Sequence, residues 1–344
     1  MKIKAETWVM GLFVVLAVAY LGWLNISKPR ILVLHSYDPE YAWSRDVNVG
    51  LNRVLRNSYR YQLRWHYMDT KRHPTAAYKQ AAGIAARNVI VEMRPDVVIA
   101  LDDDAQSYAA RYLVNQPGIS IVFAGVNNEA SDYGYDKATN ATGILERLPL
   151  AAIQEALGQA QGLRALQRPL RLAYLGDASH SVEGDLQQIR GFAWGPVVLQ
   201  STTQVRTWPE WQAQVRSLAP SADVLLLTGY RSLRRSAQDP SLVSAREVVT
   251  WTDANAGVPV ISGNGFFTED GGMLAVGTSP YEQGEEAARR ALDIAVRGTP
   301  AAQIPITEAQ HFIVTMNASL MQAHNFALPR IYEAAARTGD KHLP

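Results

Sequence analysis

The sequence predicts an α/β protein with two Rossmann-like lobes, each built around a parallel sheet, preceded by an N-terminal hydrophobic helix. Three observations lead to this fold class. Short aliphatic runs alternate with longer amphipathic ones, as expected of strands and the helices that cover them. The alternation occurs in two successive halves, and 344 residues suffice for two domains of ordinary size. Several aliphatic runs are continuous, which indicates strands buried on both faces.

The first element is an apolar segment that extends from Trp8 to Leu24 and follows two lysines. Its length is at the lower limit for crossing a bilayer and is long for the apolar part of a signal peptide. We expect residues 1–29 to form an uncleaved transmembrane anchor. A signal peptide cleaved after the Ala-Val-Ala at 17–19, or a helix buried in a core, are the alternatives.

Strands and helices alternate in the half of the chain that follows this segment. Its strands are predicted from continuous or alternating apolar runs, and its helices from apolar residues at helical spacing, such as Val47, Leu51 and Val54. Predicted strands cover 30–36, 61–68, 96–100 and 119–125, and predicted helices cover 44–57, 75–94 and 104–115.

The second half repeats this layout without repeating the sequence. Predicted helices cover 148–160, 181–192, 208–218, 241–257 and 280–300. Predicted strands cover 171–177, 196–202, 223–229, 258–263, 272–279 and 311–317. The last residues, 331–344, are expected to form a tail.

Composition excludes several classes of function. The formal net charge is +1, with 33 Lys and Arg against 32 Asp and Glu, so the chain has no global field that would attract nucleic acid. The absence of cysteine excludes disulfides, cysteine-ligated zinc, thiol catalysis and a lipidated N-terminal cysteine.

Polar and aromatic residues follow the predicted strands of both halves. Ligands of open parallel α/β sheets bind beyond the carboxyl ends of the strands, so these residues are the candidates for a ligand site. Each has a simpler explanation: the polar ones can cap helices or turns, and the aromatic ones can pack the lobes. The candidate ligand-binding residues are Ser36, Tyr37, Trp43, Asp102, Asp103, Asn127, Tyr230, Asn264 and Phe266.

No catalytic or phosphate-binding motif accompanies these residues. A nucleophile elbow, a zinc-protease HExxH, a P-loop and a dinucleotide-binding glycine motif are all absent from the sequence, and the seven histidines lack metal-ligand spacing. We therefore expect no enzyme activity, no metal and no cofactor. A hydrolase or isomerase that uses Asp102 and Asp103 is the less favoured alternative.

Five stretches occur in the order and spacing of one known family: HSYDPEYAW, YMDTKRHP, PDVVIALDDDAQSYA, ISIVFAGVN and ATGILE. Together they resemble the ABC-transporter substrate-binding proteins with the type I periplasmic-binding-protein fold. The resemblance extends over roughly residues 30–325. It is closest to the branch that includes extracytoplasmic sensor domains of signalling proteins.

The resemblance implies two lobes joined by three crossovers, near 143–147, 277–280 and 300–305. The expected N-terminal lobe comprises 30–146 plus 279–302, and the C-terminal lobe 147–278 plus 303–330.

The resemblance also implies a function. The chain would be an extracytoplasmic solute-binding protein that traps a small molecule, such as an amino acid, for an ABC permease. Asp102 would bind an amine, Ser36 and backbone N–H groups a carboxylate, and Tyr37, Trp43 or Phe266 an apolar part. The expected location is the periplasmic face of a bacterial inner membrane, or the periplasm if the N-terminal segment is cleaved. A membrane-anchored sensory subunit that delivers its signal to a membrane partner is the alternative.

Overall fold

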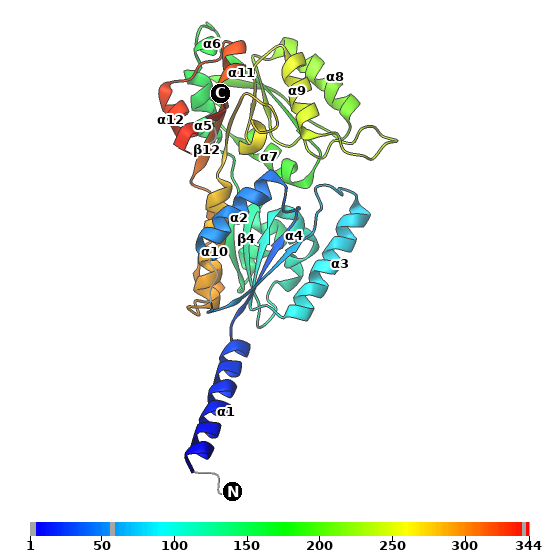
Figure 1. Cartoon of the computed structure of the whole chain (residues 1–344). Coiled ribbons are helices and arrows are strands. Elements are labelled where there is room, and N and C mark those ends of the chain that lie inside the picture. Colours follow the sequence, from blue (N-terminus) through cyan, green and yellow to red (C-terminus); the bar gives the residue numbers. More distant parts are fainter. Residues whose placement is uncertain (1–4, 56–58, 339–341, 344) are drawn as a thin grey trace.

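The computed structural model describes residues 5–55, 59–338 and 342–343, which form two α/β lobes and a projecting N-terminal helix (Figure 1). The predicted fold class is confirmed. Each lobe has one sheet with helices on both faces, and the two sheets lie one above the other in Figure 1.

The first sheet has six strands in the order β11-β5-β4-β3-β1-β2, and every neighbouring pair is parallel. The strands are β1 (Arg30–His35), β2 (Gln62–Tyr67), β3 (Val97–Leu101), β4 (Ser120–Val126), β5 (Ala141–Leu145) and β11 (Thr307–Glu308).

Alternate residues of these strands enter two different cores. Ile31 and Val33 of β1 belong to the core formed with α2 (Ala42–Val54) and α10 (Pro280–Ala295). Leu32 and Leu34 enter the opposite core, formed with α3 (Ala76–Met93) and α4 (Asp102–Tyr108). Burial on both faces explains why the strand sequences read as continuous aliphatic runs.

The ends of the first-lobe helices follow from local sequence. The side chain of Thr75 accepts a hydrogen bond from the backbone N–H of Tyr78 at the start of α3, and α3 ends just before Pro95. Ser279 caps α10 in the same way, followed by Pro280 in the first turn.

The second sheet has seven strands in the order β13-β12-β10-β9-β8-β6-β7, parallel except for the pair β10–β12. The strands are β6 (Leu170–Asp177), β7 (Val197–Val205), β8 (Val224–Leu227), β9 (Val260–Ser262), β10 (Leu274–Thr278), β12 (Phe312–Asn317) and β13 (His342–Leu343).

Helices α8 (Trp208–Leu218) and α9 (Ala245–Ala256) cover one face of this sheet. The other core contains residues of α5 (Leu150–Gln159), α7 (His180–Gly191) and the C-terminal segment. Short helices α6 (Gln161–Arg164), α11 (Ala318–Ala323) and α12 (Arg330–Thr338) complete the lobe.

The chain passes between the lobes three times, after β5, after β10 and after β11. The third crossover differs from the expected position. Since β11 pairs with β5, Thr307 and Glu308 belong to the first sheet, and the crossover lies at residues 309–311 instead of 300–305. Part of the expected tail, 331–344, also departs from prediction, because α12 packs beside β12.

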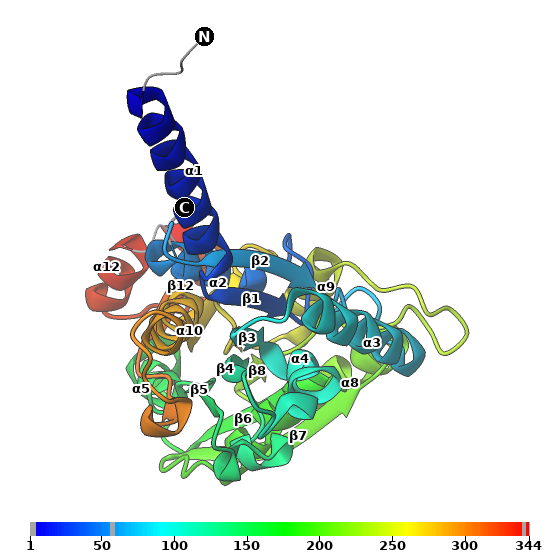
Figure 2. The same cartoon turned by 90° about the horizontal axis from the view of Figure 1, so that it is seen from below.

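Helix α1 (Ala5–Ile26) extends away from the first lobe in both views (Figures 1 and 2). Its large apolar side chains, among them Trp8, Phe13 and Trp23, are exposed. Among the helices in the described ranges, none combines the length and apolar character needed to cross a bilayer. The predicted transmembrane anchor is therefore not supported.

Candidate functional site

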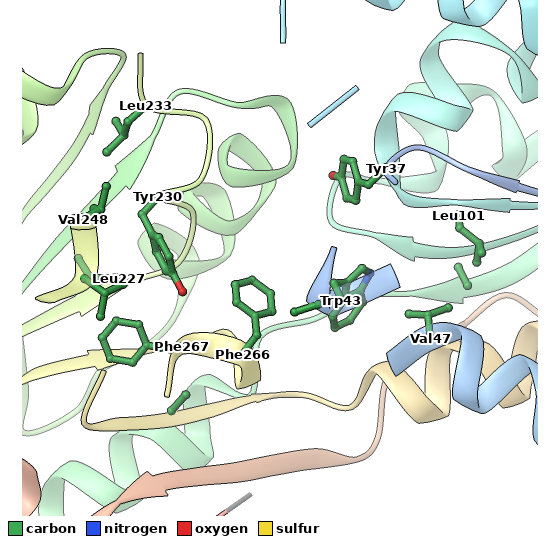
Figure 3. Packing of buried hydrophobic residues seen from close by; sticks show 14 of the residues in the cluster. Tyr37, Trp43, Val47, Leu101, Leu227, Tyr230, Leu233, Val248, Phe266 and Phe267 are labelled. Carbon is green, nitrogen blue, oxygen red and sulfur yellow. The ribbon is translucent and has the colours of Figure 1, made fainter. Parts of the chain in front are cut away.

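The carboxyl ends of strands from both sheets face a small cavity between the lobes. Figure 3 shows Tyr37 and Trp43 of the first lobe on one side, with Phe266 and Tyr230 of the second lobe opposite. The free space is about 40 Å³, enough for a few water molecules and less than a metabolite requires. The lining residues are Tyr37, Tyr41, Trp43, Lys71, Asp102, Asn127, Glu146, Ser181, Val182, Asp185, Thr228, Gly229, Tyr230, Arg231, Asn264 and Phe266.

Asp102 is the most unusual residue of this cavity. It follows β3 directly, its φ is +64°, and only 3% of it is exposed. The indole of Trp43 hydrogen-bonds to its carboxyl, but Oδ2 is buried without a partner. A left-handed backbone conformation and an unpaired buried acceptor each cost free energy, which points to a functional role for this position.

Burial raises the pKa of the Asp102 carboxyl well above its ordinary value, and the nearby charge of Asp103 raises it further. The Trp43 hydrogen bond and the charge of Lys71 oppose this shift. A cationic ligand group beside Asp102 would favour the ionised form and supply the missing hydrogen bond.

Two cations face the cavity, and neither was among the predicted site residues. Lys71 is 8% exposed, its ammonium lies 5.1 Å from the centroid of the Tyr37 ring, and no ion pair to it is found in the described ranges. Arg231 donates through Nη2 to both carboxylate oxygens of Asp270, at 2.7 and 2.6 Å, while its buried Nε has no partner.

Aromatic rings join the two lobes around Arg231. Its guanidinium lies 5.2 Å from the centroid of Tyr41, in the first lobe, and 4.8 Å from that of Phe266, in the second. The Tyr41 and Phe266 rings are 5.7 Å apart, and the Tyr37 ring meets Tyr41 edge-on at 5.1 Å. These rings give the cavity flat apolar walls.

Two further acids, Glu146 and Asp185, line the cavity and were not predicted. Glu146 follows β5 at the first crossover, whereas Asp185 lies on α7 of the second lobe. The Asn127 amide donates to Asp185 Oδ1 at 3.0 Å and also hydrogen-bonds to Glu146. Burial raises the pKa of both carboxyls, that of Asp185 to about 7.

Seven of the nine predicted residues lie around this cavity: Tyr37, Trp43, Asp102, Asn127, Tyr230, Asn264 and Phe266. Tyr230 donates its hydroxyl to Asp270 Oδ2 at 2.6 Å, and the Asn264 amide donates to the Thr228 carbonyl. Both interactions fix the second-lobe wall.

Ser36 and Asp103 do not line this cavity. Ser36 Oγ donates to the Leu101 carbonyl at 2.6 Å and accepts from the Ala105 N–H at 2.7 Å, so its hydroxyl has no capacity left for a ligand carboxylate. Asp103 accepts hydrogen bonds from Asn128 and from the Tyr133 hydroxyl, and it holds β4 to α4. These hydrogen bonds tie elements of the first lobe to one another.

Most of the missed residues follow a strand, so the expectation that ligands bind beyond the strand ends could have identified them. Lys71 comes a few residues after β2, Glu146 directly follows β5, and Arg231 follows Tyr230 beyond β8. Asp185 carried no such signal, because it reaches the cavity from within helix α7. Among the described residues, no cluster of His, Asp and Glu could hold a metal ion.

Comparisons with known proteins agree with this architecture. Residues 235–337 match the sequence profile of the family described as ABC transporter substrate binding protein. A comparison with curated proteins found no match. The match over residues 235–337 agrees with the resemblance to ABC-transporter substrate-binding proteins, and the similar structures confirm the two-lobed type I fold.

Solved structures similar to this chain share low sequence identity with it. A conserved domain protein from Vibrio cholerae has a TM-score of 0.67 at 15% identity, covering 90% of this chain and 98% of its own. An ABC domain from Streptococcus pneumoniae in complex with L-Trp has a TM-score of 0.66 at 13% identity, covering 92% and 100%. A solute-binding protein from Bacillus halodurans with bound myo-inositol has a TM-score of 0.51 at 16% identity, covering 86% and 97%.

Proposed function

We propose that this chain, related to the ABC transporter substrate-binding proteins, is an extracytoplasmic solute-binding protein that traps an α-amino acid between its lobes. The observation that carries this proposal is the buried carboxyl of Asp102, whose Oδ2 lacks a hydrogen-bond partner and which shares one cavity with the cations Lys71 and Arg231. An α-amino acid presents the complementary pair of charges on adjacent carbon atoms.

Each ligand group has a defined partner in this proposal. The ammonium donates to Asp102, where it replaces the missing hydrogen bond. The carboxylate accepts from Lys71 and from the unpaired Nε–H of Arg231, a role that Ser36 cannot take. The apolar part of the ligand lies against Trp43 and Phe266.

Trapping depends on lobe movement. Because the cavity is smaller than an amino acid, the lobes must part to admit the ligand and then close upon it. The ligand favours the closed form by contacting both lobes at once, and the closed form is what an ABC permease would recognise. Proteins of similar fold bind an amino acid, L-Trp, in one case and a polyol in another, so the choice of an amino acid rests on the charges of this cavity.

A thermal-shift screen of the full chain against amino acids and uncharged sugars tests the proposal. An amino acid at a hundredfold excess over its Kd stabilises the folded state by about 2.7 kcal/mol, which raises Tm by several degrees. Trp43→Ala and Asp102→Asn should reduce the shift by about half or more, whereas Asp136→Asn, which changes an exposed acid of the same lobe, should leave it unchanged. Stabilisation by a sugar alone, or an undiminished shift in Asp102→Asn, would contradict the proposal.

A further inference from the structure

Acidic groups outnumber cationic ones around the cavity. Asp102, Glu146 and Asp185 line it, against Lys71 and Arg231, and the charge of Arg231 is already balanced by Asp270 outside the cavity. An amino acid with a neutral side chain adds one charge of each sign and leaves this excess of acid unchanged. A ligand with a neutral side chain therefore does not explain why the cavity holds more acidic than cationic residues.

Glu146 and Asp185 are the acids without a role in binding the α-amino and α-carboxylate groups. They are 6% and 4% exposed, and both line the cavity. Burial raises the pKa of Glu146, and the charge of Asp185 raises it further. Within the described chain, neither forms an ion pair with a Lys, Arg or His. Their shared polar contact is the neutral amide of Asn127.

We propose that Glu146 and Asp185 form a second cation subsite, so that the ligand is a diamino acid whose side-chain amine is held there. This inference rests on the proposed function, because Asp102 must first anchor the α-ammonium. The unpaired Oδ2 of Asp102 shows independently that the cavity offers a buried acceptor to a ligand.

A primary ammonium suits this subsite better than a hydroxyl. It donates up to three hydrogen bonds and brings a charge that compensates two buried carboxyls at once. The rings of Trp43 and Phe266 provide apolar walls for the methylene chain between the two amines, in the way that lysine stems lie along aromatic surfaces.

The subsite also links binding to proton release. Glu146 and Asp185 are buried acids that retain protons at higher pH than ordinary carboxyls do. An ammonium placed between them favours their ionised forms, so a diamino acid should expel a proton that an analogue with the same carbon chain and no side-chain amine does not.

Calorimetric titration of the full chain with L-lysine and with L-norleucine, its uncharged analogue, tests the inference. We expect L-lysine to bind at least about tenfold more tightly, the effect of one charge-assisted hydrogen-bonded contact. Titrations in two buffers of different ionisation enthalpy should show about one proton more released by L-lysine than by L-norleucine.

Substitutions separate this inference from the proposed function. Glu146→Gln and Asp185→Asn should remove the preference for L-lysine over L-norleucine. Glu183→Gln, which changes an exposed acid on the same helix as Asp185, should leave this preference unchanged. Asp102→Asn should lower the affinity for both L-lysine and L-norleucine.

The outcomes are distinguishable. Equal affinity and equal proton release for the two ligands in the unmodified chain would overturn the second subsite and leave amino-acid binding intact, even if a variant failed to fold. Failure of both ligands and of every other amino acid to bind would overturn the proposed function itself.

Discussion

Asp102 combines an unfavourable backbone conformation with an unfavourable electrostatic environment. Asparagine tolerates a φ of +64° at least as well as aspartate, whereas alanine does not. Asp102→Asn should therefore fold normally while losing about 10- to 100-fold in ligand affinity, the effect of a charge-assisted hydrogen bond. Asp102→Ala should lose stability as well. Urea unfolding separates the two effects, and an Asp102→Asn variant that keeps full affinity would remove Asp102 from the site.

Asp185 makes folding stability depend on pH. Burial raises its pKa from 3.8 to about 7 in the folded protein. Between these values the folded protein holds a proton that the unfolded chain has released, so stability falls as pH rises. Through the Asp185 carboxyl, the unmodified chain should lose free energy of unfolding between pH 5 and pH 8. Asp185→Asn should reduce this loss by about 3 kcal/mol or less.

The comparison must be made between the variant and the unmodified chain, because His35 acts in the opposite direction. Burial lowers the pKa of His35 from 6.5 to about 3, so its contribution to stability increases with pH in that range. Urea unfolding of both proteins at several pH values cancels the shared His35 effect. Parallel pH profiles would show that the Asp185 carboxyl titrates normally.

At the scale of single residues, the sequence predicted the candidates that stand at strand ends and missed those placed by tertiary structure. Tyr37, Asp102 and Phe266 follow strands and lie around the cavity. Ser36 follows one too, but hydrogen bonds to its neighbours consume its hydroxyl. Asp185 could not be found by this rule, because its position depends on how α7 packs against the first lobe.

Helices α2 and α10 pack closely through glycines. A Cβ at Gly284 would collide with the carbonyl oxygen of Val47, and a Cβ at Gly50 would collide with the backbone of Tyr281. These obstacles are backbone atoms within two helices, so they cannot move aside cheaply.

Gly284→Ala should destabilise the protein by about 1–3 kcal/mol, although alanine is the better helix former. Gly158→Ala on α5 is the matched control, because a Cβ there meets no atom within 4 Å. It should be neutral or stabilise by up to about 1 kcal/mol. Chemical unfolding of the two variants measures both values, and equal behaviour would contradict the close packing of α2 against α10.

At the scale of elements, long periodic segments were predictable and short ones were not. Residues 75–94 were predicted as one helix, and α3 occupies Ala76–Met93. Strand β11 comprises only Thr307 and Glu308, too few residues to show any pattern, and its pairing with β5 depends on the whole chain. The position of the third crossover was therefore inaccessible to sequence reasoning.

At the scale of the whole molecule, direct contacts between the lobes contribute to the closed form. Arg45 on α2 forms an ion pair with Glu269 of the second lobe at 3.0 Å, and both side chains are partly exposed. Partly exposed ion pairs contribute about 0.2–1 kcal/mol, so this contact adjusts closure without controlling it.

Glu269→Gln should therefore weaken ligand affinity by less than about fivefold, because closure loses one modest contact. The effect should shrink at high salt. Glu92→Gln, which removes an exposed ion pair with Arg64 inside the first lobe, is the control and should not change affinity. Calorimetric Kd values at two salt concentrations make the comparison, and a loss above a hundredfold would show that this pair controls closure.

The central claim is that an amino acid is held between the lobes with its ammonium on Asp102. A crystal structure of the chain grown with the tightest-binding amino acid of the thermal screen tests it most directly. The account predicts the ligand in the cavity between Trp43 and Phe266, its α-ammonium within hydrogen-bonding distance of the Asp102 carboxyl and its carboxylate near Lys71 and Arg231. A ligand that contacts one lobe alone, or that binds away from Asp102, would contradict it.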